Sequence, residues 1–168
     1  MKRLAIVAVM IAAVILQSTI CSFVCWKGLK PDLVTVIVIL TGLIHGLVPG
    51  CVMGIAGGFI LDYFTGRLLG AGALSKMAIG ALSGWIAPKI FGDHLLVPPT
   101  SVLVGTWLEQ TIYLLLVNAF GRGLPVIRSL WTIVLPVGLL NVIFVFPIYY
   151  TLLALERIRS QGGTREDG

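Results

Sequence analysis

Long apolar runs separated by short polar breaks make up most of the chain. Six of them cover residues 4–26, 33–47, 49–64, 68–91, 95–120 and 126–155. Four are long enough to form a membrane-spanning helix, which needs roughly 20 residues. The second and third are shorter, yet joined together they exceed one straight span. Gly46 and Pro49 lie between them, and a glycine followed by a proline in a first helical turn favours a tight reversal. The pattern therefore predicts six helices.

The composition of the chain indicates that these predicted helices lie in a membrane. The chain has 168 residues, of which 58% are apolar and 11% charged, and its mean hydropathy is +1.04. The apolar runs do not alternate with polar residues as the strands of a membrane barrel do. We therefore expect an all-α integral membrane protein, with one domain over residues 1–159 that forms a six-helix transmembrane bundle. The first run is too long for a cleaved signal peptide, so we expect it to remain as the first helix.

Charge bears on the topology and excludes one class of partner. Most of the twelve basic residues are scattered through the predicted loops, the helix ends and the C-terminal tail, without the basic stripe that nucleic acid requires. Six spans place six basic residues on the side of the N-terminus and five on the other, and five spans would reverse that tally. The positive-inside rule therefore favours six spans with cytoplasmic termini by a small margin only. The polar segment 160–168 has nothing apolar to pack, and we expect it to be a disordered cytoplasmic tail.

Glycines recur at every fourth position from residue 42 to residue 70, and an acid, Asp62, takes the one place that breaks the series. Residues four apart share one face of a helix, and strips of small residues let membrane helices approach closely. The next helix repeats the spacing. We expect the third and fourth helices to pack through two such strips, formed by Gly50, Gly54 and Gly58 on one helix and by Gly72, Gly80 and Gly84 on the other.

Charged residues inside the predicted spans are costly in hydrocarbon unless they are paired, and they are therefore candidate functional positions. The sequence offers Asp62, Lys76, Lys89 and Glu109. Across an antiparallel hairpin, Asp62 and Lys76 come to neighbouring depths, so we expect Asp62 to pair with Lys76 or with Arg67. The alternative is that both charges extend to the headgroups. Glu109, in the middle of the fifth helix, is expected to bond a neighbouring helix in preference to a ligand.

Motifs of intramembrane catalysis are missing from the sequence. Ser83 and Gly84 resemble part of a rhomboid protease motif, but no histidine follows in a later helix to act as a base. Cys21 and Cys25 lie four apart, and buried thiols are favoured there over a disulfide. No cysteine has a histidine at metal-ligand spacing. We therefore expect no enzyme activity, no cofactor and no metal site.

Several elements, in order, resemble the MreD family of bacterial rod shape-determining membrane proteins. They are Leu16-Gln17-Ser18-Thr19, Lys30-Pro31-Asp32-Leu33, the glycine series ending at Asp62, and Gly70 with Gly72-Ala73-Leu74-Ser75-Lys76. The resemblance covers about the first half of the chain. Its strength lies in the order and spacing of the elements, since small residues four apart are common in membrane helices.

The resemblance implies a non-enzymatic part of the cell-elongation complex in the bacterial inner membrane. Such a protein binds MreC and, through it or directly, RodA, a class B transpeptidase and MreB, and so supports sidewall peptidoglycan synthesis and rod shape. The family is similar in fold to the substrate-binding subunits of energy-coupling-factor vitamin transporters. A vitamin-capture subunit is therefore the alternative function, with Glu109, Gln110 or Asn118 as candidate ligands in a polar cavity.

Overall fold

Helices account for every regular element in the part of the chain that the structure describes. In this computed structural model those residues are 15, 17, 30–66, 68–90, 96–121 and 123–162. The elements are α2 (Leu33–His45), α3 (Leu47–Thr65), α4 (Ala71–Ile90), α5 (Val97–Ala119), α6 (Val126–Ser129), the π-helical turn η1 (Leu130–Val134) and α7 (Leu135–Gly162). The all-α prediction is confirmed over these residues. The first predicted helix, residues 4–26, lies outside them except for Ile15 and Gln17.

Within the described residues, three helical segments are long and apolar enough to cross a membrane. They are α3, α5, and the continuous stretch Val126–Ala154 that joins α6, η1 and most of α7. The helix α2 is also apolar but has only 13 residues. These lengths are compatible with a membrane protein, because roughly 20 residues span the hydrocarbon layer.

A single residue separates α2 from α3. Gly46 has a φ of +94°, a conformation that residues with a side chain rarely adopt, and its N–H donates to the carbonyl oxygen of Gly42. Pro49 follows in the first turn of α3, where its missing N–H has no helical partner to lose. The chain therefore reverses at Gly46, where the sequence predicts a turn.

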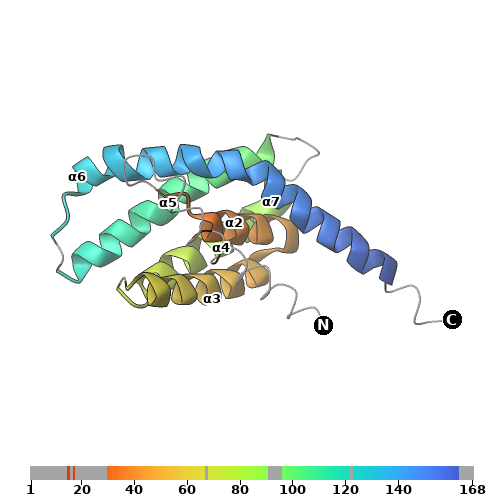
Figure 1. The fold of residues 1–168 in the computed structure, drawn as a ribbon, viewed down its shortest axis with the longest axis horizontal. Coiled ribbons are helices and arrows are strands. Elements are labelled where there is room, and N and C mark those ends of the chain that lie inside the picture. The colour runs from red at the N-terminus through yellow and green to blue at the C-terminus, as the bar shows by residue number, and fades with distance from the viewer. Residues whose placement is uncertain are drawn as a thin grey trace.

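The helix α2 forms the centre of the bundle. Every residue from Leu33 to Leu43 is buried, and the helices α3, α4, α5 and α7 all pack against it. Figure 1 shows α2 between the α3–α4 hairpin on one side and the pair formed by α5 and α6–α7 on the other. The hydrophobic core gathers around Val36, Ile39 and Leu40 of α2, with Val102 and Val145 from the opposite side.

The helices α3 and α4 lie against each other backbone to backbone. A Cβ atom added at Gly50 would overlap the carbonyl group of Gly80, and one added at Gly54 would overlap the carbonyl of Lys76. Gly58 stands equally close to Ala73, and Gly84 to Leu47. The two glycine strips therefore face each other across the hairpin. Gly72 differs, because the space beside it is filled by the carboxylate of Asp62.

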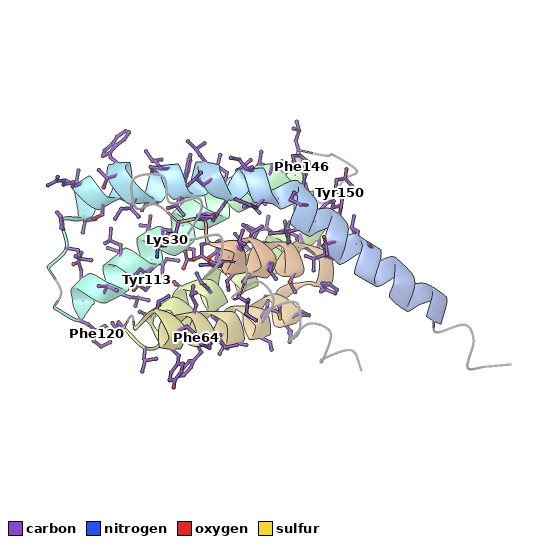
Figure 2. The ribbon with its side chains drawn as sticks, viewed as in Figure 1. Lys30, Phe64, Tyr113, Phe120, Phe146 and Tyr150 are labelled. Carbon is purple, nitrogen blue, oxygen red and sulfur yellow. The ribbon has the colours of Figure 1, made fainter. Side chains whose placement is uncertain are left out.

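The last helix is interrupted by one wide turn and then bends. Pro136 has no N–H, and its ring would collide with the carbonyl of Thr132 in a regular α-helix. In η1 the N–H of Leu135 instead donates to Leu130, five residues earlier, which carries the chain past the proline. Figures 1 and 2 show a second bend beside the labelled Phe146 and Tyr150, where Pro147 lies inside α7.

The helix α7 continues past the last apolar run. It ends at Gly162 and so includes residues 160–162 of the predicted tail. The remaining positions of that tail, 163–168, lie outside the described residues.

Candidate functional site

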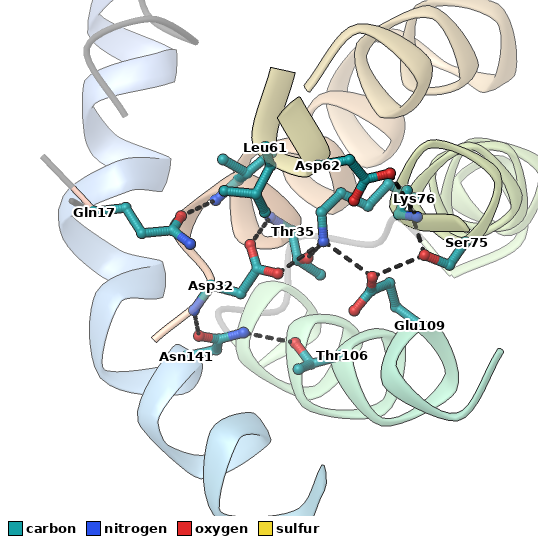
Figure 3. A network of polar contacts seen from close by, with 12 residues as sticks. Gln17, Asp32, Thr35, Leu61, Asp62, Ser75, Lys76, Thr106, Glu109 and Asn141 are labelled. Carbon is teal, nitrogen blue, oxygen red and sulfur yellow. Dashed lines mark hydrogen bonds and ion pairs between the residues drawn. The ribbon is translucent and has the colours of Figure 1, made fainter. Parts of the chain in front are cut away.

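Lys76, on α4, is the centre of a buried polar network and contacts residues of α2 and α5 and the N-cap of α2. Its ammonium group lies 2.7 Å from Asp32 Oδ2, 2.7 Å from Thr35 Oγ1 and 2.9 Å from Glu109 Oε1. Figure 3 shows these three contacts converging from the start of α2 and from the middle of α5. An ammonium has three donors, and each is used here. The side chain is therefore fully satisfied although it is buried.

Asp32 connects this network to the last helix. It is the N-cap of α2, because its Oδ1 accepts a 3.0 Å hydrogen bond from the N–H of Thr35. The N–H of Asp32 donates to Asn141 Oδ1 at 2.8 Å, and the amide nitrogen of Asn141 donates to Thr106 Oγ1 at 3.1 Å. The side chain of Gln17 adds a contact to the first turn of α2, because its Oε1 accepts a 3.4 Å hydrogen bond from the N–H of Val34. The network thus reaches α2, α4, α5 and α7.

Glu109 bonds a neighbouring helix through one carboxylate oxygen. Its Oε1 accepts from Lys76 and from Ser75 Oγ, the latter at 3.0 Å, and both donors belong to α4. Its Oε2 is buried and has no hydrogen-bond partner among the described residues. Through Oε1, Glu109 therefore ties α5 to α4.

Asp62 does not pair with Lys76, and that prediction is wrong. Its Oδ2 accepts from the backbone N–H groups of Gly70 at 3.0 Å and Gly72 at 2.9 Å. The carboxylate therefore caps the N-terminal end of α4, where unpaired N–H groups and the positive end of the helix dipole favour an anion. The glycine strips bring α3 and α4 too close for a long side chain to lie between them, so Lys76 extends toward α2 and α5 instead. The second predicted partner, Arg67, lies outside the described residues.

Sequence reasoning missed Asp32 as an intramembrane charge because it precedes an apolar run. The signal available was an aspartate directly before a helix with a threonine three residues later, which is typical of an N-cap. Asn141 was missed as well, although it is a lone amide within the apolar run 126–155 and buried polar groups require partners. Lys89 belongs to α4, but its side chain is not among those that the structure describes.

A cavity of about 240 Å³ lies among α2, α4 and α5, separate from the Lys76 network. Its lining includes Ile39 and Leu43 of α2, Ile79 and Ser83 of α4, and Thr100 and Val104 of α5. None of the three candidate vitamin ligands lines it. One of them, Asn118, instead bonds the backbone of Leu124 through both its oxygen and its nitrogen, which fixes the turn after α5.

Comparison with known proteins adds no relative: no protein-family model, no curated protein and no solved structure matches the chain. Among the described residues, no group of three or more His, Cys, Asp or Glu side chains is placed to hold a metal ion.

Proposed function

We propose that this chain is a non-enzymatic membrane scaffold of the bacterial cell-elongation complex, of the MreD type. The observation that carries the proposal is the meeting of the elements on which the resemblance rests. Lys76 contacts Asp32, 44 residues earlier, and so joins the Gly72–Lys76 element to the Lys30–Leu33 element. Asp62, which ends the glycine series, bonds Gly70 and Gly72. The sequence elements that carry the resemblance are thus joined to one another by hydrogen bonds in the fold.

The chemistry of the network fits a scaffold. The ammonium of Lys76 and the carboxylate of Asp62 are engaged by groups of the chain itself. Buried ions that are bonded by the chain itself hold helices in one arrangement, and Lys76 has no donor left with which to bind a substrate. In such a protein the intramembrane charges serve the fold, and function resides in the surfaces that the fold presents to partners.

The helix α3 offers such a surface. Its side opposite the glycine strip carries large exposed apolar residues at helical spacing: Val48, Val52, Ile55, Phe59 and Tyr63. In a bilayer this ridge faces either lipid or another membrane helix. The proposed partner is MreC, which has one membrane-spanning helix, and through it or directly RodA, a class B transpeptidase and MreB. The proposed topology has six spans, with residues 4–26 as the first and with both termini in the cytoplasm.

The alternative, a vitamin-capture subunit with the related fold, has less support. It requires a cavity with polar ligands, and the candidate Glu109 is engaged by Lys76 and Ser75. The cavity among α2, α4 and α5 is lined mainly by aliphatic side chains. A vitamin with several polar groups would lose its hydrogen bonds to water there without replacement.

Depletion of the protein in its bacterial host tests the two functions directly. The scaffold proposal expects rods to become round as the protein is lost, with no change in vitamin requirement. Unchanged cell shape together with a new vitamin requirement would contradict it and support the transporter. Cell length and width report shape, and the growth rate in rich and in vitamin-free medium reports the vitamin requirement, so that one strain gives both readings.

A further inference from the structure

Glu109 has one carboxyl oxygen that the Lys76 network does not use. Its Oε1 accepts from Lys76 Nζ at 2.9 Å and from Ser75 Oγ at 3.0 Å, whereas Oε2 is buried and accepts from no group among the described residues. Only 1% of the residue is exposed. An ionised carboxylate carries its charge on both oxygens, and an unpaired charge away from water is far more costly than a neutral group. An ionised Glu109 would therefore keep part of its charge on an oxygen that none of these donors reaches.

The ammonium of Lys76 serves two carboxyl groups at once. It lies 2.7 Å from Asp32 Oδ2 and 2.9 Å from Glu109 Oε1. A single positive charge in hydrocarbon balances a single negative charge, so its effect is divided between the two groups. The carboxyl group with the fewer other donors is then the one that favours a proton.

Asp32 is better suited than Glu109 to remain ionised. As the N-cap of α2 it lies at the positive end of a helix dipole, and its Oδ1 accepts from the N–H of Thr35 at 3.0 Å. Both of its carboxyl oxygens are thus engaged. Glu109 lies in the middle of α5, far from both ends of that helix, and a helix dipole acts only within the first or last turn. Of the two groups, Glu109 is the one that the structure leaves to be neutralised by a proton.

A proton on Oε2 of Glu109 would find an acceptor within α5. The hydroxyls of Thr100 and Thr111, on the same helix, each donate to the carbonyl oxygen four residues earlier at 2.7 Å. A carboxylic acid offers the same kind of O–H donor, and a helical carbonyl oxygen keeps a second lone pair. Glu109 does not line the cavity among α2, α4 and α5, so that cavity does not place a larger ligand beside Oε2. A proton is the ligand that fits this enclosed oxygen.

We infer that Glu109 binds a proton on Oε2 at neutral pH. The network then holds Lys76 as a cation between an ionised Asp32 and a neutral Glu109, which still accepts from Lys76 and Ser75 through Oε1. Among the described residues, the charged groups that face Glu109 are Lys76 from α4 and Asp32 from the start of α2, and α7 contributes the neutral Asn141. Loss of the proton would place a second negative charge in this space and weaken the contact between α5 and α4.

Infrared spectroscopy of the full chain at pH 7, in a detergent without carbonyl groups, detects this proton directly. A protonated carboxyl group gives a C=O stretching band that ionised carboxylates lack. We expect the band in the wild type, its loss in Glu109→Gln, and no change in the matched control Asp62→Asn, whose side chain caps α4 outside this network. Absence of the band from the wild type, or its persistence in Glu109→Gln, would overturn the inference.

An isotope label assigns the band even if Glu109→Gln fails to fold. Glutamate carrying carbon-13 in its side-chain carboxyl group, incorporated into the wild-type chain, is expected to move the band to lower frequency. A band that does not move belongs to an aspartate and contradicts the assignment to Glu109.

Unfolding at different pH gives a second readout. In the unfolded chain an exposed glutamate is ionised near neutral pH, so unfolding releases the bound proton and becomes more favourable as the pH rises. We expect the unfolding equilibrium constant, measured in detergent micelles, to rise about tenfold more between pH 6 and pH 7 in the wild type than in Glu109→Gln. Equal pH dependence of the two proteins would contradict proton binding at Glu109.

Discussion

Removal of the Lys76 ammonium is the perturbation with the largest expected effect. Lys76→Met keeps most of the unbranched apolar stem of the side chain but deletes three hydrogen bonds of 2.7–2.9 Å and leaves the carboxyl groups of Asp32 and Glu109 without this cation. Single hydrogen bonds inside membrane proteins contribute about 0.6–1.7 kcal/mol. Breaking a buried ion pair by removing one partner costs about 3–5 kcal/mol, because the remaining charge stays buried. We therefore expect the free energy of unfolding to fall by about 3–5 kcal/mol.

The assay is reversible unfolding in mixed detergent micelles, followed by circular dichroism as a denaturing detergent is added. The matched control is Arg128→Met, which makes the same kind of change at an exposed position at the start of the last helix and is expected to cost at most about 0.5 kcal/mol.

A second substitution separates a broken ion pair from general damage. Glu109→Gln removes one of the two carboxyl groups that Lys76 leaves behind, so the double variant Lys76→Met with Glu109→Gln should lose less than the two single losses added together. We expect a coupling of about 1 kcal/mol or more. Additive losses, or a Lys76→Met protein within about 1 kcal/mol of the wild type, would refute the assignment of Lys76 to this network.

Three further changes test the hairpin by the same unfolding measurement. Gly54→Ala forces the backbones of α3 and α4 apart and is expected to lower the free energy of unfolding by about 1–3 kcal/mol. The control, Ala56→Leu on the exposed side of α3, should be nearly neutral. Equal losses of stability in the two variants would contradict close packing of the helices. Asp62→Ala removes the cap of α4 and is expected to cost about 0.5–2 kcal/mol, with a smaller loss for Asp62→Asn, which keeps an acceptor oxygen; equal losses would argue against the cap. Exchanging the charges as Asp62→Lys with Lys76→Asp should restore nothing lost in the single variants, because the two side chains do not meet, and any recovery of stability would revive their pairing.

Spacing along the sequence was sufficient to locate the α3–α4 interface. Glycine at every fourth position describes one face of a helix whatever surrounds it, and the structure places Gly50, Gly54 and Gly80 on facing strips. Apolar run length likewise indicates helices, because a membrane allows few other structures. These features depend on residues close together in the chain.

The partners of the buried charges could not be predicted from local spacing along the sequence. Asp62 and Lys76 lie at neighbouring depths in the α3–α4 hairpin, and this suggested that they form a pair. The actual partners of Lys76 depend on where α2 and α5 lie, and packing over the whole bundle sets those positions. The true partners lie 44 and 33 residues away. The prediction for Asp62 also considered only charged partners. In the structure its carboxylate accepts hydrogen bonds from backbone N–H groups at the start of α4.

Binding to MreC tests the central claim, that this bundle is a scaffold, most directly. The two full-length proteins, purified separately in a mild detergent and mixed at micromolar concentration, are passed through size-exclusion chromatography with light scattering. The account predicts one peak whose protein mass equals a stoichiometric complex. Separate elution of two proteins that are each folded and at their own mass would contradict it.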